Sequence, residues 1–111
     1  MKKKIEMFIG GESRPIKFGI NQQDYYCELR GGISVNKMNE EFATFATGDY
    51  QLSVIRDFFW SALKEGARYW DKSDFDYTNF DVGDWMEEAD VDEISKAFKA
   101  YSDSLPKPKK K

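Results

Sequence analysis

The chain has 111 residues, of which 41% are hydrophobic, 16% aromatic and 33% charged, and its formal net charge is −3. This composition suits one hydrophobic core and excludes a disordered chain, and no apolar run reaches the roughly 20 residues of a membrane-spanning helix. The sequence has no histidine and one cysteine, Cys27, which excludes the commonest general base, an internal disulfide and a cysteine-rich zinc site. These absences argue against an enzyme, although they leave catalysis by carboxylates, lysine or tyrosine open, and we predict no metal or cofactor.

Charge is unevenly distributed along the sequence. The first 20 residues carry five bases and two acids, whereas the segment from Asp71 to Glu93 carries ten acids and one base, Lys72. The opening MKKKIEMFIGG begins like a signal peptide, but Glu6 interrupts an apolar segment shorter than the roughly 7–15 residues that such peptides contain. We therefore predict a cytoplasmic protein that spans no membrane, with basic ends and an acidic late middle.

Residues 4–19 have the pattern of a β-hairpin. Apolar residues alternate with outward-facing positions on both sides of a Gly10-Gly11 turn. Pro15 has no N–H group and therefore suits the edge or the start of a strand. Because a lone hairpin is only marginally stable in water, we expect it to pack against helices.

Five helices are predicted after the hairpin, over residues 21–30, 36–47, 49–69, 81–88 and 90–104. The expected N-caps of the first three are Asn21, Asn36 and Asp49. Asp90 is the expected N-cap of the last helix, and Glu93 follows three residues later in a capping-box pattern. The fold class is therefore α+β, a mostly helical small domain with an N-terminal β-hairpin, which spans residues 1–105.

The helix predicted over residues 49–69 has the broadest apolar surface. Leu52 and Ile55 begin a stripe that continues at three- and four-residue spacing. Phe58, Phe59 and Trp60 are consecutive, so one helix face cannot bury all three. We expect at least one of them, Trp60 in particular, to be exposed or to lie at an interface.

The acidic segment has two interpretations. Aspartates near helix N-termini are electrostatically favourable and explain part of it, and its spacing does not match an EF-hand loop. The other interpretation is a surface that binds a partner. The candidate partner-binding residues combine aromatic side chains with acids of this segment: Phe58, Phe59, Trp60, Trp70, Trp85, Asp84, Glu87 and Glu88.

Two remaining features are Cys27 and the basic end of the chain. A reactive thiolate requires nearby positive charge, which Arg30 could supply, but without histidine a buried structural thiol is the better interpretation. Four lysines lie in the end segment SLPKPKKK, which we predict to be a flexible basic tail over residues 106–111. The acidic domain beside it, and the absence of aromatic residues among the lysines, argue against a nucleic-acid-binding arm.

The order of these features resembles a known family. The opening IEMFIGGESRPIKFGI contains the pattern I-G-G-x-x-x-x-I-K-F-G. The predicted helix YQLSVIRDFFWSALKEGARYW follows it. The later segment DFDYTNFDVGDWMEEADVDEISKAFKAYSDSL contains V-x-D-W-M before an amphipathic helix. In pattern and order the chain is similar to the tail assembly chaperones of long-tailed bacteriophages and prophages, over most of residues 5–105.

The resemblance implies a non-enzymatic role in virion assembly. Such proteins bind the tape measure protein in the host cytoplasm, keep it soluble and help recruit tail tube protein subunits. They are often made in a second, longer form by a ribosomal frameshift, so we hypothesise that Lys109, Lys110 and Lys111 mark the slippery site, with Pro106 and Pro108 in the linker. The alternative is a small acidic protein-binding or inhibitory module that uses the surface from Asp71 to Glu93 to mimic a polyanion.

Overall fold

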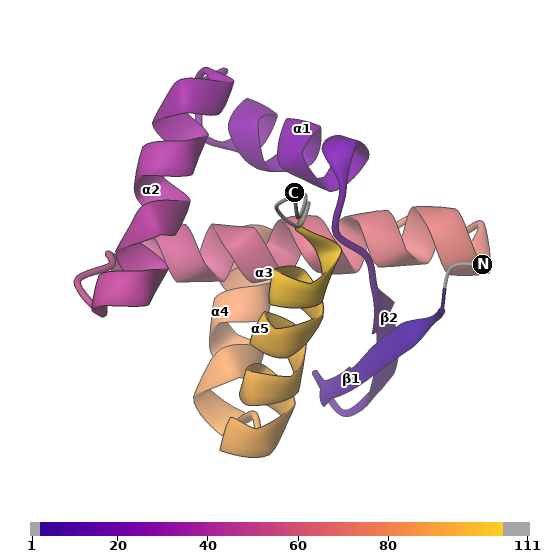
Figure 1. Cartoon of the computed structure of the whole chain (residues 1–111). Coiled ribbons are helices and arrows are strands. Elements are labelled where there is room, and N and C mark those ends of the chain that lie inside the picture. Colours follow the sequence, from indigo (N-terminus) through magenta and orange to yellow (C-terminus); the bar gives the residue numbers. More distant parts are fainter. Residues whose placement is uncertain (1–2, 106–111) are drawn as a thin grey trace, which may run out of the picture.

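The computed structural model describes residues 3–105 and has the predicted α+β fold. A hairpin of β1 (Ile5–Ile9) and β2 (Glu12–Ile16) precedes the helices α1 (Ile20–Leu29), α2 (Val35–Thr47), α3 (Leu52–Gly66), α4 (Asn79–Glu88) and α5 (Val91–Ser104). Figure 1 shows α3 crossing the middle of the molecule, with α1 on one side of it and α4 and α5 on the other. The predicted tail, residues 106–111, and the proposed frameshift position lie outside the described residues.

The hairpin forms as the alternation predicts. Gly10 and Gly11 have φ values of 64° and 83°, which suit a two-residue turn between antiparallel strands. Because side chains alternate between the two faces of a strand, Met7 and Ile9 enter the core, and each is no more than 1% exposed. The same alternation turns Phe8 outward, where 57% of its surface is exposed.

The centre of the core is formed by α3. Phe58 and Phe59 are both completely buried, whereas Trp60 is half-buried. Both phenylalanines are buried because helices cover α3 on more than one side. Aromatic rings from the loop after β2, from α2 and from α5 pack around Phe58. They belong to Phe18, Phe42, Phe45, Phe98 and Tyr101. Leu52, expected in the buried stripe, is 80% exposed because it occupies the first turn of the helix.

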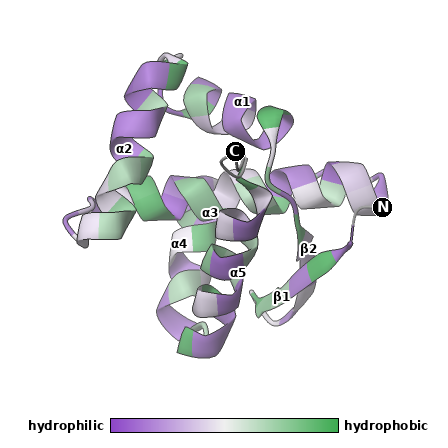
Figure 2. Cartoon of the chain, viewed as in Figure 1, coloured by the Kyte–Doolittle hydropathy of each residue, from purple (hydrophilic) through white to green (hydrophobic). Residues whose placement is uncertain are grey.

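Figure 2 shows that hydrophilic residues share every helix with hydrophobic ones. This mixture fits amphipathic helices around one core. In α5 the predicted apolar face is only partly buried: Ala97 is inaccessible, but Val91 is 74% exposed at the start of the helix.

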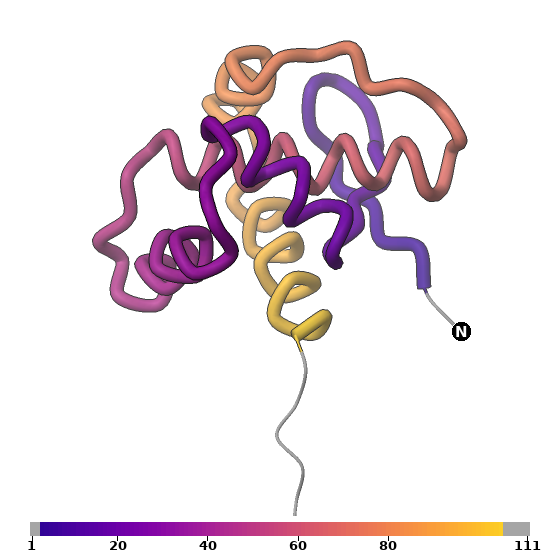
Figure 3. The backbone as a smooth tube through the Cα atoms, turned by 90° about the horizontal axis from the view of Figure 1, so that it is seen from above, coloured from indigo at the N-terminus to yellow at the C-terminus, as the bar shows by residue number. Residues whose placement is uncertain are grey.

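The end of α3 continues as a short π-helix, η1 (Ala67–Asp71). The helical segment therefore runs two residues beyond the predicted end at residue 69. Figure 3 shows the following segment, residues 72–78, running back along α3 to the start of α4. Trp60 fastens this segment to α3, because its indole N–H donates a 2.9 Å hydrogen bond to the Tyr77 carbonyl.

The backbone of β2 packs directly against the backbone of α3. A β-carbon built on Gly66 would overlap the carbonyl oxygen of Pro15, so only glycine allows this approach. The Lys17 N–H also donates to the Ala62 carbonyl at 3.1 Å. The glycine near the end of the helix therefore positions β2 on α3.

The predicted N-caps Asn21, Asn36 and Asp49 are each wrong by two residues. The actual N-cap positions are Gly19, Ser34 and Gln51. In α2 the Ser34 hydroxyl accepts the Lys37 N–H at 3.1 Å, which satisfies the helix end before Asn36 is reached. In α3 no side chain caps the helix, so the sequence carries no local marker of its start. In α1 the N-cap Gly19 has no side chain to accept a hydrogen bond, and the Gln22 side chain accepts the Gly19 N–H at 3.4 Å.

The last two helices have side-chain caps. Thr78 caps α4 in a reciprocal box with Asp81: the Thr78 hydroxyl accepts the Asp81 N–H, and the Asp81 carboxylate accepts the Thr78 N–H. This start lies before the predicted residue 81. Asp90 caps α5 as predicted, by accepting the Asp92 N–H at 3.0 Å. The carboxylate of Glu93 does not complete that box but binds the hairpin.

Candidate protein-binding surface

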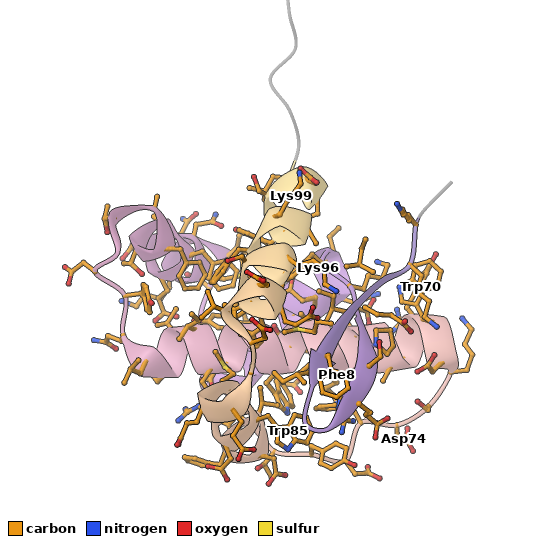
Figure 4. The ribbon with its side chains drawn as sticks, turned by 90° about the horizontal axis from the view of Figure 1, so that it is seen from below. Phe8, Trp70, Asp74, Trp85, Lys96 and Lys99 are labelled. Atoms are coloured by element: carbon orange, nitrogen blue, oxygen red, sulfur yellow. The ribbon has the colours of Figure 1, made fainter. Side chains whose placement is uncertain are left out.

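An open groove lies where the hairpin turn meets the junction of α4 and α5. Its volume is about 630 Å³, and we call it the hairpin-tip groove. It is lined by Phe8, Ile9 and Gly10 from the hairpin and by Trp85, Glu88 and Ala89 from the helical side, with Gly11 and Asp90 beside them. Figure 4 shows Phe8 and Trp85 at this end of the hairpin.

Trp85 forms the base of the groove. Its ring packs directly on Gly10, where any β-carbon would come within 2.5–2.9 Å of three ring atoms. The guanidinium of Arg14 lies 4.3 Å from the centre of the Trp85 ring and donates to the carbonyls of Ile9 and Gly10 at 2.9 and 3.0 Å. These contacts hold the hairpin turn, the arginine and the indole in one arrangement, so the groove is formed before a partner arrives.

Phe8 stands on the rim of the groove. Its backbone N–H donates a 2.6 Å hydrogen bond to the carboxylate of Glu93, a residue 85 positions away in the sequence. Lys96 lies 3.0 Å from the same carboxylate. The Phe8 hydrogen bond, followed by Lys96, lowers the pKa of Glu93 below its ordinary value. α5 is therefore bound to the outer edge of β1, next to the exposed phenyl ring.

Glu88 and Asp90 line the groove, and further exposed carboxylates lie on α4 and α5. Asp84, Glu87, Glu88 and Asp92 are exposed on α4 and at the start of α5. Within residues 3–105, no ion pair joins any of these four to a base. In contrast, Asp71 pairs with Lys4. The negative charge near the groove is therefore not neutralised by the fold.

The predicted candidate residues separate into three groups. Phe58 and Phe59 belong to the core and cannot contact a partner. Trp60 and Trp70 are half-buried elsewhere on the molecule. Trp85 and Glu88 line the hairpin-tip groove, and Asp84 and Glu87 are exposed on the same helix.

Sequence reasoning missed Phe8. A signal was available, because an aromatic residue at an outward position of an alternating strand has no core to enter. The neighbours of Phe8 could not be inferred, since they come from α4 and α5.

A second groove, of about 470 Å³, lies at the opposite end of the hairpin. Ile5, Ile16, Phe18 and Trp70 supply its apolar lining, together with two lysines and Asp103. The indole N–H of Trp70 is buried without a hydrogen-bond partner among the described residues.

Buried charged side chains link the helices through hydrogen bonds and ion pairs. Asp57 is 3% exposed and accepts hydrogen bonds from Arg30 at 2.8 Å and from Arg56 and Asn79 at 2.9 Å. Arg30 also contacts Glu41, which accepts the hydroxyl of Tyr26 at 2.6 Å. These bonds link α1, α2, α3 and α4 around the first half of the central helix. Burial, with a smaller contribution from Glu41, raises the pKa of Tyr26.

Cys27 is buried at 9% exposure, as expected for a structural thiol. Burial, followed by the nearby Asp24 and Glu41 charges, raises the pKa of its thiol, which is the reverse of an activated nucleophile.

No group of three potential metal-ligating side chains converges within residues 3–105. In the same part of the chain, no helix has the length and apolar character needed to cross a bilayer. No family model, curated protein or solved structure matches the chain.

Proposed function

We propose that this protein is a non-enzymatic tail assembly chaperone of a long-tailed phage or prophage, which binds the tape measure protein in the host cytoplasm. The observation that carries the proposal is the hairpin-tip groove, where an exposed phenylalanine and a tryptophan base lie near carboxylates that form no ion pair within the described part of the chain. The resemblance in the order of sequence elements supports the same function.

The physical requirements of such a role match this surface. A chaperone for an aggregation-prone helical client needs exposed apolar area to cover the client and uncompensated charge to keep the complex soluble. Phe8 and Trp85 supply the apolar area. The charge comes from four exposed acids, namely Asp84, Glu87, Glu88 and Asp92.

Co-expression with the tape measure protein of the same genome tests this function. We expect the wild-type chain to increase the soluble fraction of the tape measure protein and Phe8→Ala to reduce that effect. Leu52→Ala is the matched control, because Leu52 is 80% exposed but lies away from the groove. A tape measure protein whose solubility is the same with and without the wild-type chain would exclude the chaperone function.

The second candidate function is an acidic module that binds a basic protein through charge alone. It is favoured by Asp74 and Asp76, which are exposed on the segment before α4 and extend the acidic surface away from the groove. The two candidates differ in their salt dependence. Binding through charge alone should disappear at about 1 M salt, where the Debye length is about 3 Å, and should not depend on Phe8.

A further inference from the structure

The hairpin edges beside the groove limit which secondary structure a bound partner can have. Peptides commonly bind beside a hairpin by adding a strand to an open edge. The register pairs Met7 with Arg14 and Ile9 with Glu12, so the backbone of Phe8 points to the outer edge of β1. That N–H is already bound to Glu93, and α5 packs beside the strand. The β1 edge is therefore closed.

The edge of β2 is also unsuited to a strand. Pro15 has no N–H group to offer, and its carbonyl lies against Gly66 of α3. A partner at the hairpin tip must therefore satisfy its own backbone hydrogen bonds. An α-helix does so, and it presents apolar side chains to a groove at intervals of three and four residues.

The groove supports this interpretation by its charge. The acids beside it have no basic partner within residues 3–105, so their charge is complementary to that of a basic partner. Lysine or arginine residues that flank an apolar stripe would provide that charge.

We propose that the hairpin-tip groove binds a basic amphipathic α-helix, with apolar side chains against Phe8 and Trp85 and with lysine or arginine residues facing Asp84 and Glu88, which lie one turn apart on the same side of α4. This proposal rests on the proposed function in one respect, namely that the client is a helical protein. The client binds at the hairpin-tip face of the chaperone, and the bound segment carries positive charge.

Titration of the full chain with designed peptides tests the proposal. The probe is an amphipathic peptide of about 18 residues with leucines on one face and lysines beside them, long enough to be helical. One control peptide carries glutamate in place of lysine, and another has the same composition in an order without an apolar face. Binding is followed by NMR through the Trp85 indole N–H and the amides of Gly10 and Gly11.

We expect the leucine–lysine peptide to shift these resonances and the two control peptides to leave them unchanged. Phe8→Ala should weaken its affinity by about tenfold or more, as at other interface anchors. The double variant Asp84→Asn, Glu88→Gln should weaken it and reduce its salt dependence. The matched controls are Leu52→Ala and, on α1, the pair Asp24→Asn, Glu28→Gln, whose residues are exposed.

Three outcomes would overturn the proposal: no binding of the leucine–lysine peptide, equal binding of the leucine–glutamate peptide, or shifts confined to the groove beside Trp70. These outcomes are distinct from failure of the proposed function. If the peptide binds at Phe8 but the tape measure protein stays insoluble, the chaperone function fails and the groove assignment stands. If the tape measure protein is solubilised and the peptide does not bind, the groove assignment alone fails.

Discussion

Substitution of Gly66 by alanine tests how the hairpin is held on the central helix. Helix propensity alone would make Gly66→Ala stabilising by about 1 kcal/mol. However, the new methyl group would overlap the Pro15 carbonyl, which belongs to the backbone and cannot rotate away. Forcing such a group into a packed contact costs about 1–3 kcal/mol. Displacement of β2 would also lengthen the hydrogen bond from the Lys17 N–H to the Ala62 carbonyl, worth about 1 kcal/mol.

The expected net effect of Gly66→Ala is a loss of about 2 kcal/mol in the free energy of unfolding, measured by urea denaturation and far-UV circular dichroism. Gly83→Ala in α4 is the matched control. A β-carbon there would lie 3.2 Å from Cδ of Arg56, a flexible side chain that can move. We expect Gly83→Ala to be neutral or to stabilise by up to about 1 kcal/mol. If Gly66→Ala were as stable as Gly83→Ala, the close contact between β2 and α3 would be refuted.

Three further substitutions test the buried polar groups and the link from α5 to the hairpin. Trp70→Phe removes a buried N–H group that has no hydrogen-bond partner within residues 3–105. The free energy of unfolding should therefore stay unchanged or rise by up to about 1 kcal/mol, and a loss of more than about 1 kcal/mol would show that the indole N–H has a partner. Arg30→Met removes one of the two arginines that bind Asp57 and should cost about 2 kcal/mol in urea denaturation, whereas a loss below about 1 kcal/mol would contradict a structural role. The pKa of Glu93 in the folded protein lies below its ordinary value of 4.5. The ionised carboxylate therefore stabilises the folded state above pH 4.5, and this stabilisation disappears as the pH falls through the folded pKa. The stability difference between wild type and Glu93→Gln should therefore shrink below pH 4.5, and a difference independent of pH would mean that the Phe8 N–H does not bind a carboxylate.

The elements of this fold could be predicted from the sequence because their signals are local. The Gly10-Gly11 turn and the alternation around it define the hairpin, and Asp90 marks the start of α5. Helix starts without a local signal were misplaced, as at Asp49, where no side chain caps α3. The start of α4 had such a signal, since Thr78 precedes an aspartate by three residues, but it was not used.

The candidate site could be predicted only in part, because it is formed by tertiary contacts. The burial of Phe58 and Phe59 depends on helices packing on several sides of α3, which periodicity within one helix does not reveal. Phe8 meets Glu93 across 85 residues of sequence, so their proximity has no local signature. Trp85 was identified as a candidate from its type alone, and its place under the hairpin turn comes from Gly10.

The central claim is that the client binds at the hairpin-tip groove, and site-specific photocrosslinking tests it most directly. A photoreactive amino acid replaces Phe8 in one version of the chain and Leu52 in another, in cells that also express the tape measure protein. Both positions are exposed, at 57% and 80%, so accessibility alone cannot explain a difference. We expect a covalent adduct with the tape measure protein from position 8 and little or none from position 52. Equal adducts from both positions, or none from position 8, would contradict the claim.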